Sequence, residues 1–424
     1  MPIHRLAPVL REHVDSLDDA GTAKGAESVV VAVRRADGAR GPRFLLAGEG
    51  DREFIRMNSN SYLGMGLCPE VIQAEEEATR VFGAGPGAVR FISGTYQAHV
   101  DLERELAAFH GREEAMIFSS AYATVVSTIT PLVSAETVVI SDELNHNCII
   151  NAMRLARPAG KSVYPHNDTA ALDAALVEWK GKSRRALVVT DGIFSMRGDH
   201  APLAEIMEIC ARHDADYPEN VVCVVDDSHG VGAFGATGRG TEEYTGSPPV
   251  DILVGTLGKA FGVNGGYVAA DAATIRFLRE SSQMYIYSNP ITVGEAAAAL
   301  ASVRFVAGPE GRKLLDRLRA LTNQFEDGLG RIGIETIPGE HPVVPLMIRD
   351  TARTRDLVRY LRERGVLVTG LTHPVVPKGD EEIRAQVNAD HTESDIDHVL
   401  GLLEAYPALG PPAAATPTVR RRSP

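Results

Sequence analysis

Short apolar runs alternate with amphipathic stretches through the middle of this chain. Residues 221–225 are four valines and one cysteine, a run typical of a strand buried on both faces of a parallel sheet. In parallel sheets, functional side chains collect at the carboxyl ends of the strands. Further apolar runs predict strands at 115–118, 137–140, 186–190, 251–255 and 265–269. Helical spacing predicts helices at 69–82, 99–109 and 202–213.

The flanks of the chain differ from the middle in their pattern and suggest a division into four parts. We expect an N-terminal arm at residues 1–58 that serves packing or a dimer contact, a large domain at 59–288 and a smaller C-terminal domain at 289–406. Residues 407–424 are rich in proline and alanine and are predicted to be disordered. The flanking elements are predicted helices at 6–17, 296–306, 311–329 and 351–364 and strands at 29–33, 343–348, 366–369 and 383–388.

Composition narrows the class of protein. The chain has 424 residues, of which 44% are hydrophobic and 23% charged, so it can bury a large core. A formal net charge of −13 argues against a general nucleic-acid or anionic-membrane binder. No apolar run reaches the roughly 18 residues of a membrane span, and the first residues lack the apolar region of a signal peptide. Four cysteines without metal-like spacing indicate reduced thiols, and we expect a cytoplasmic protein that binds no metal: Cys68, Cys148, Cys210 and Cys223.

Lys259 follows the predicted strand at 251–255 and has apolar or glycine neighbours on both sides. Burial among such residues disfavours an ammonium ion and frees an amine for Schiff-base chemistry. An isolated lysine in such a loop is more often a surface residue. The acids at the end of the preceding predicted strand favour the interpretation of Lys259 as a buried, reactive amine.

Asp226, Asp227 and His229 stand at the end of the run at 221–225. A carboxylate at the mouth of a core strand loses hydration unless it meets a cation, and a pyridinium nitrogen is such a cation. An aspartate that pairs with this nitrogen keeps the ring protonated, so that the ring accepts electrons from a carbanion. A lysine for the aldehyde and an aspartate for the ring nitrogen together indicate pyridoxal 5'-phosphate.

Other candidate residues follow other strands. Ala121 and Tyr122 begin a predicted helix whose free backbone N–H groups suit a phosphate, although a simple capped helix has the same pattern. Asn60 can orient a carboxylate with its amide, and a guanidinium such as that of Arg384 meets a carboxylate with two hydrogen bonds. The glycines at 83–87 follow a helix rather than a strand, which excludes a dinucleotide fingerprint and favours a substrate-channel loop.

Five ordered blocks resemble the signature blocks of the α-oxoamine synthases, which are fold-type I pyridoxal phosphate enzymes, and the resemblance spans roughly residues 55–406. It implies an α/β fold of the aspartate aminotransferase type, with a mostly parallel seven-stranded sheet in a large domain and a smaller α+β C-terminal domain. It also implies a homodimer with shared active sites. The blocks read VVDDSHGVGAFGATGRG, VDILVGTLGKAFGVNGGYV, GAVRFISGTYQAH, GIFSMRGD and IRAQVNADHT.

The resemblance also assigns roles. Lys259 is expected to carry the cofactor and act as general base, Asp226 to pair with the ring nitrogen, His229 to support that side of the ring and His146 to stack on it. The substrate carboxylate is expected to meet Asn60 and Arg384. The remaining cofactor contacts are expected from Ala121, Tyr122 and Thr256 at the phosphate, Ser195 near the phenolic oxygen, and Ser288 at the phosphate of the neighbouring subunit.

Three positions depart from the family pattern. Asn289-Pro290 stands where a small polar residue is expected, which puts the contact of Ser288 in doubt. Asp390 stands where alanine is common, and the connection at 214–220 is longer than expected and is predicted to lie on the surface.

The expected activity is condensation of a small amino acid with an acyl thioester and release of CoA. The blocks look most like the glycine C-acetyltransferase branch, which uses glycine and acetyl-CoA. Three alternatives stay open: a related synthase with alanine or serine and a longer acyl-CoA or a carrier-protein donor, a pyridoxal phosphate aminotransferase or aldolase, and a scaffold that only binds the cofactor. The residues named for general base and carboxylate binding argue against the scaffold.

Overall fold

The computed structural model describes residues 2–373 and 375–407. Its centre is a seven-stranded sheet in the order β4-β10-β9-β8-β7-β5-β6. Strand β10 runs antiparallel to its neighbours β4 and β9, and the other pairings are parallel. The sheet confirms the predicted α/β fold with seven mostly parallel strands. Its strands are β4 (Glu114–Phe118), β5 (Thr137–Asp142), β6 (Gly160–Tyr164), β7 (Arg185–Asp191), β8 (Val221–Asp226), β9 (Ile252–Thr256) and β10 (Gly266–Ala270).

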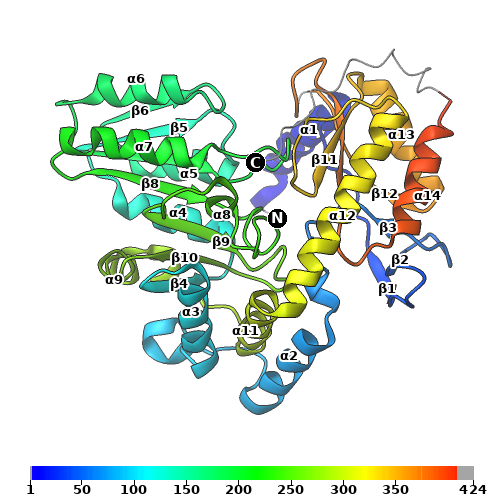
Figure 1. Cartoon of the computed structure of the whole chain (residues 1–424), viewed down its shortest axis with the longest axis horizontal. Coiled ribbons are helices and arrows are strands. Elements are labelled where there is room, and N and C mark those ends of the chain that lie inside the picture. Colours follow the sequence, from blue (N-terminus) through cyan, green and yellow to red (C-terminus); the bar gives the residue numbers. More distant parts are fainter. Residues whose placement is uncertain (1, 374, 408–424) are drawn as a thin grey trace.

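Helices cover both faces of this sheet, and the strand residues alternate between them (Figure 1). Val138 and Ile140 pack with α6 (Thr169–Trp179) and α7 (Leu203–His213), whereas Val139 packs with α4 (Ala121–Leu132) and α5 (Asn147–Ala156). Two buried faces require apolar residues at successive positions, which explains the continuous valine-rich runs. Because β5 to β9 pair in parallel, their carboxyl ends, and the polar residues that follow them, lie along one edge of the sheet.

A second lobe contains a three-stranded sheet in the order β11-β14-β13 (Figure 1). The N-terminal segment joins this lobe, because β3 pairs in parallel with β12. Helix α11 packs against α2 and α3, so one hydrophobic core continues from the large sheet toward this lobe. The proposed domain boundaries at 58, 288 and 406 stay predictions. The strands are β1 (Val30–Arg34), β2 (Arg43–Leu46), β3 (Ile55–Arg56), β11 (Val343–Met347), β12 (Val366–Leu367), β13 (Thr369–Leu371) and β14 (Glu382–Gln386).

The helices other than α4–α7 connect the strands or belong to the N-terminal segment and the second lobe. They are α1 (Leu6–Asp19), α2 (Pro69–Phe82), α3 (Gln97–His110), α8 (Thr241–Thr245), α9 (Ala272–Ser281), α10 (Gln283–Ile286), α11 (Val293–Ala307), α12 (Pro309–Arg331), α13 (Thr351–Glu363) and α14 (Glu393–Glu404). Short 3₁₀ turns lie at Pro2–Arg5, Met65–Leu67 and Asp214–Asp216, and a π-helix, η3, lies at Arg90–Gly94. No helix within the described ranges has the length and apolar character to cross a membrane.

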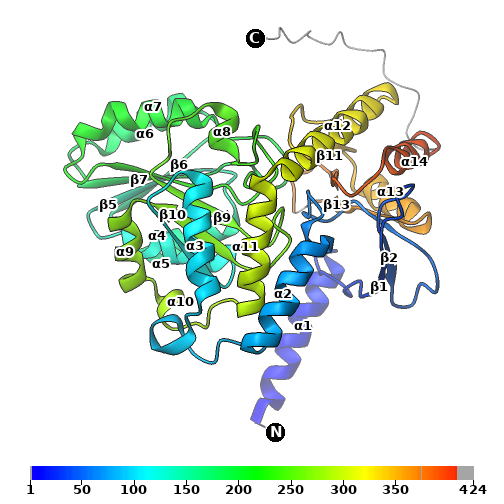
Figure 2. The same ribbon diagram turned by 60° about the horizontal axis from the view of Figure 1, so that its bottom comes forward.

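Two predicted elements differ from the structure. The predicted strand at 366–369 is two strands, because β12 pairs with β3 while β13 pairs with β14 of another sheet. The long connection at 214–220 is only partly on the surface: Tyr217 is buried, and its hydroxyl donates to the Leu176 carbonyl at 2.6 Å. Helix α1 is present as predicted but has no buried residue, and Figure 2 shows it extending from the body. Residues 408–424 of the predicted disordered tail lie outside the described residues.

His166, which follows β6, lies between two carboxylates at the edge of the sheet. Its Nδ1 lies 3.2 Å from Asp142 Oδ1, and its Nε2 lies 3.1 Å from Asp199 Oδ2. Each ring nitrogen therefore faces a carboxylate, an arrangement that favours the imidazolium form, with a hydrogen on both nitrogens. Burial alone would lower the pKa of His166, but hydrogen bonds to the two carboxylates outweigh it and raise the pKa to about 9.

We predict that His166→Gln destabilises the protein more at acidic than at alkaline pH. Because the folded pKa lies above the ordinary 6.5, the stabilisation is fully present below pH 6.5 and is lost as the pH rises through about 9. After allowance for partial solvent screening we expect a loss of about 1–2 kcal/mol at pH 6 and little loss at pH 10, measured by urea unfolding. The exposed His398 provides a control, since His398→Gln should change neither value. A loss of equal size at both pH values would contradict the ion-pair account.

Candidate active site

A cavity with about 350 Å³ of space between atoms, part of it open to solvent, lies at the carboxyl ends of the parallel strands, the edge where sheets of this class bind ligands. Seven of the residues that line it were named from the sequence, and they come from five separate segments. The structure therefore brings together side chains that the chain separates by up to 138 positions, from 121 to 259. The lining residues are Ala121, Tyr122, His146, Cys148, Asp191, Ile193, Ser195, Asp226, Ser228, His229 and Lys259.

Lys259 reaches the cavity from the turn that follows β9. This turn is closed by a hydrogen bond from the Gly262 N–H to the Lys259 carbonyl at 2.9 Å. Burial of the amine lowers its pKa to about 8, and the nearby carboxylates of Asp226 and Asp191 limit the drop. A substantial fraction of the amine is thus unprotonated near neutral pH, as Schiff-base formation requires.

Asp226 and Asp191 end the adjacent strands β8 and β7 and stand opposite each other in register. One Asp226 oxygen accepts the Ser228 N–H at 3.1 Å, and the Cys148 thiol donates to the other at 3.6 Å. Asp191 accepts the His146 N–H at 2.8 Å. Burial, together with the charge of Asp226, holds the pKa of Asp191 well above its ordinary value. Asp226 and Asp191 therefore stand side by side in the wall of the cavity.

Asp191 and Cys148 are site residues that were not predicted from the sequence. Asp191 ends an apolar run just as Asp226 does, so its position was a usable signal. Cys148 is buried in the hydrophobic core, and the turn of α5 also brings it beside His146, where the sulfur lies 2.9 Å from Nδ1.

His146 caps the N-terminus of α5, and its Nδ1 accepts the Cys148 N–H at 3.2 Å. A ring nitrogen that accepts leaves the hydrogen of the neutral imidazole on Nε2. Desolvation lowers the pKa of His146, although the side chain stays exposed at the cavity mouth in the single chain, where solvent reduces this effect. The imidazole is therefore held as a neutral, flat group at the opening.

The start of α4 forms another wall. Ser120 caps the helix by accepting the Ala123 N–H, and Ala121 and Tyr122 line the cavity at the positive end of the helix dipole. Gly266 of β10 permits this approach, since a Cβ there would come within 2.5 Å of the Ala121 Cα. Thr256 pairs in register with Gly266 and so lies near this helix start. Its hydroxyl accepts the Gly258 N–H at 3.1 Å and is 3.2 Å from the Gly265 carbonyl.

Arg384 lies on β14 and connects the second lobe to the cavity. Its Nε donates to the Ser195 carbonyl at 2.5 Å, and its Nη2 donates to Asn60 Oδ1 at 3.1 Å. The predicted carboxylate-binding residues Asn60 and Arg384, 324 positions apart, are therefore in direct contact beside the cavity wall.

Three remaining residues lie elsewhere. Ser288, which follows α10, does not line the cavity of its own chain. Asp227 turns away from the cavity: Thr241 donates to it from its N–H at 2.7 Å and from its hydroxyl at 2.6 Å, and burial raises its pKa to about 7. Of the two adjacent acids, only Asp226 therefore faces the site. Asp390 lies beside Gly64 and outside the cavity lining.

A larger hollow, of about 1530 Å³, lies at the opposite ends of the strands. Its walls include Arg185, Glu219 and Asp251, and it contains none of the residues predicted to carry chemistry. We therefore assign the smaller cavity as the active site.

Comparison with known proteins identifies the family of this chain. The family model "Aminotransferase class I and II" matches residues 52–403. The chain is 38% identical over 411 residues to 2-amino-3-ketobutyrate coenzyme A ligase of Bos taurus, covering 96% of this chain and 92% of that protein. It is 36% identical over 380 residues to 8-amino-7-oxononanoate synthase of Citrifermentans bemidjiense, covering 89% and 95%. The chain belongs to the α-oxoamine synthase family.

Solved structures of this family share its fold. Serine palmitoyltransferase of Sphingomonas wittichii superposes with a TM-score of 0.84 at 27% identity, covering 95% of this chain and 97% of that one. A serine palmitoyltransferase structure that contains pyridoxal phosphate superposes with a TM-score of 0.85 at 26% identity, covering 95% and 97%. The cofactor is pyridoxal phosphate. The cavity fits it, since it combines a lysine of lowered pKa, an aspartate for the ring nitrogen and a helix start for the phosphate.

We predict that Lys259 alone carries the cofactor, and that its lowered pKa sets the rate at which the apoprotein takes up pyridoxal phosphate. Borohydride reduction followed by peptide mass spectrometry should find the modification at Lys259 and none in Lys259→Ala. Uptake of pyridoxal phosphate by the apoprotein should rise about tenfold from pH 7 to pH 9 and then level off, because the unprotonated fraction of a group of pKa about 8 saturates there.

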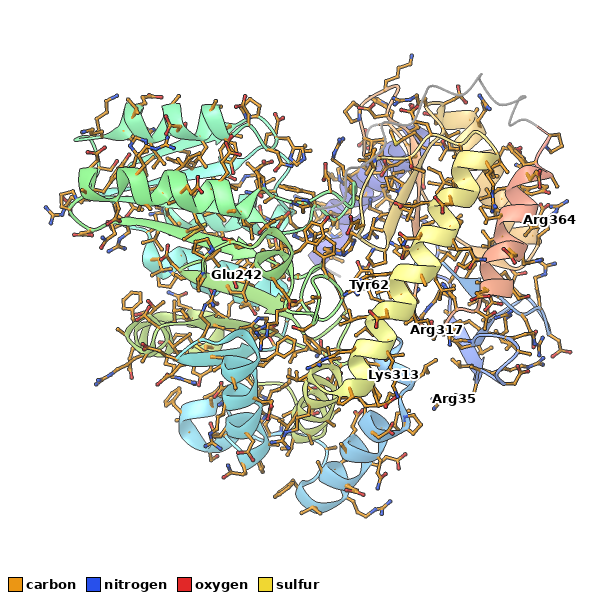
Figure 3. The ribbon with its side chains drawn as sticks, viewed as in Figure 1. Arg35, Tyr62, Glu242, Lys313, Arg317 and Arg364 are labelled. Atoms are coloured by element: carbon orange, nitrogen blue, oxygen red, sulfur yellow. The ribbon has the colours of Figure 1, made fainter. Side chains whose placement is uncertain are left out.

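The exposed Lys313 on α12, labelled in Figure 3, serves as the control, and Lys313→Ala should keep both results. A rate that keeps rising tenfold per pH unit above pH 9 would mean that Lys259 has the pKa of an exposed lysine.

Proposed function

We propose that the protein condenses a small amino acid with an acyl-CoA, with glycine and acetyl-CoA as the preferred pair. The products are CoA and a 2-amino-3-oxo acid, or the aminoketone after loss of carbon dioxide. The observation that carries this proposal is the combination of Lys259, with a pKa of about 8, and the Arg384–Asn60 pair beside the same cavity. A cofactor-binding scaffold needs neither a base nor a carboxylate site.

Bound pyridoxal phosphate supplies an electron sink for the substrate carbon that loses its proton. Asp226 would hold a proton on the ring nitrogen, and His146 would pack on the ring. The backbone N–H groups of Ala121 and Tyr122 hold the phosphate, with Thr256 adjacent. Lys259 Nζ would remove the α-proton of the bound amino acid as general base, a role worth about 10²–10⁴ in rate.

Arg384 orients the amino acid. Its Nη2 already donates to Asn60, and its guanidinium offers further donors to a carboxylate in a fixed fork. The hydrogen bond to the Ser195 carbonyl fixes the direction of this fork. An arginine fixed in this way holds the substrate α-carbon in one position relative to Lys259, which favours loss of the same proton in each turnover.

Glycine with acetyl-CoA is supported by the block at 88–95 and by the relative named 2-amino-3-ketobutyrate coenzyme A ligase. A second candidate has its own support, because several relatives of similar identity are named 8-amino-7-oxononanoate synthase. In that case the amino acid would be larger than glycine and the acyl donor longer. Glycine and alanine differ by one methyl group, which a pocket distinguishes by only about 1–3 kcal/mol.

A second copy of the chain is proposed to complete the site. Large apolar side chains are exposed around η3 and α10, which contact each other: Phe82, Phe91, Ile92, Met284 and Tyr287. A patch of this kind favours burial against a partner surface. Ser288 directly follows Tyr287, so its proposed contact with the phosphate of the neighbouring subunit is compatible with this face as the dimer interface.

We predict that the holoprotein releases free thiol from acetyl-CoA only when an amino acid is present, fastest with glycine and slower with alanine or serine. Lys259→Ala should lower the rate at least about 100-fold, because the general base is lost. Arg384→Ala should raise the KM for the amino acid about 10- to 100-fold, which corresponds to charged hydrogen bonds of about 1.5–3 kcal/mol.

Arg364 provides the matched control for Arg384. It lies over the Tyr360 ring at the edge of the second lobe, far from Tyr62 in Figure 3, so Arg364→Ala should leave the KM unchanged. Faster release with alanine and a longer acyl-CoA than with glycine and acetyl-CoA would favour the second candidate. Thiol release that does not depend on any amino acid would contradict both.

A further inference from the structure

Tyr62 occupies an unusual position next to the site. Its side chain is fully buried, and its φ of 40° lies in the left-handed region that residues other than glycine rarely adopt. Its carbonyl accepts the Ala389 N–H at 2.6 Å, which ties it to the segment after β14. Such strained residues persist where the surrounding structure holds them and often have a functional role. Figure 3 shows Tyr62 between the large sheet and α12.

The Tyr62 hydroxyl lies 2.6 Å from His229 Nδ1 and 3.4 Å from Asn60 Oδ1. It also bonds the guanidinium of Arg384, which has only donors. Its oxygen therefore accepts from Arg384, and its own proton goes to the closer acceptor, His229 Nδ1. Burial raises the pKa of Tyr62, so it stays a phenol.

His229 is a neutral imidazole in this setting. Burial, and then the positive charges of Lys259 and Arg384 and the rings of His341 and His146, hold its pKa well below the ordinary value. A neutral imidazole has one donor and one acceptor nitrogen. Since Nδ1 accepts from Tyr62, the hydrogen lies on Nε2.

His341 fixes the backbone of His229. The Nδ1 of His341 accepts the Val343 N–H at 3.2 Å, so its Nε2 donates to the His229 carbonyl, 2.9 Å away. The rings of His341 and Tyr62 meet edge to face, with centroids 5.3 Å apart. Tyr62 and His341 together leave His229 little freedom to rotate or change tautomer.

We propose that Tyr62 is a positioning residue that holds His229 as the Nε2–H tautomer and joins it to Arg384. His229 then presents a hydrogen-bond donor toward the bound pyridoxal phosphate. Arg384, which is proposed to bind the substrate carboxylate, is one hydrogen bond away from Tyr62, so the three side chains form a relay. The inference depends on cofactor binding and not on the acyl donor, so it can fail or hold independently of the proposed reaction.

The test is a pH titration of the visible absorbance of the holoprotein without substrate. A hydrogen-bond donor next to bound pyridoxal phosphate stabilises the deprotonated form of the cofactor. Loss of a fixed donor therefore raises the midpoint, the pH at which half of the absorbance change has occurred. We expect Tyr62→Phe to move the midpoint up by about 0.5–1 pH unit, the size of one weakened hydrogen bond to a charged group. Tyr267→Phe is the control, because Tyr267 is an equally buried tyrosine bonded at 2.8 Å to His110, away from the cavity. It should leave the midpoint unchanged.

The double variant Tyr62→Phe/His229→Asn separates a relay from a merely structural effect. If Tyr62 acts through His229, the double variant has the midpoint of His229→Asn alone. Additive shifts, or an unchanged midpoint in Tyr62→Phe, would overturn the proposal. Should Tyr62→Phe fail to fold, nitrogen-15 NMR of the histidines in the unaltered holoprotein, with His229→Asn for assignment, reads the tautomer directly. A hydrogen on Nδ1 of His229 would also overturn it.

Discussion

The site depends on the burial of an amine, Lys259, close to the carboxylates of Asp226 and Asp191. Removal of these groups from water costs several kcal/mol per ion unless each finds a partner, and this cost lowers the pKa of the lysine and raises that of Asp191. The mostly parallel sheet meets the requirement because β7, β8 and β9 end side by side, so residues that follow three separate strands share one cavity. The cofactor therefore binds to an arrangement of charges that is already present in the single chain.

Much of this arrangement could be predicted from the sequence because it is local. Asp226 and His229 directly follow an apolar run, and Lys259 follows another, so identification of the strands identified the residues at their ends. Asp191 was overlooked although it ends its run in the same way as Asp226. The contacts of Tyr62 with His229, and of Asn60 with Arg384, span 167 and 324 positions and depend on how the second lobe meets the large sheet. No periodicity in the chain contains that information.

The difference between local patterns and contacts made outside the element also explains where the predicted secondary structure differs from the observed fold. Residues 366–369 form one apolar run, yet β12 and β13 belong to different sheets because β3, from the N-terminal segment, pairs with the first half. The π-helix η3 was not predicted. Its first residue, Arg90, forms a buried ion pair with Glu103 of α3 at 3.1 Å, a contact that the local pattern does not contain. In both places a contact beyond the element itself, and not the local pattern, accompanies the observed structure.

The central claim is that the cavity activates the α-proton of a small amino acid, and exchange of that proton with solvent deuterium tests it most directly. In deuterated buffer without any thioester, proton NMR should show the holoprotein replacing one α-proton of glycine, and Lys259→Ala should show none. Alanine and serine run in parallel would rank the amino acids without reference to the acyl donor. If none of the three exchanges above the background given by free pyridoxal phosphate, Lys259 does not act as the base and the account is wrong.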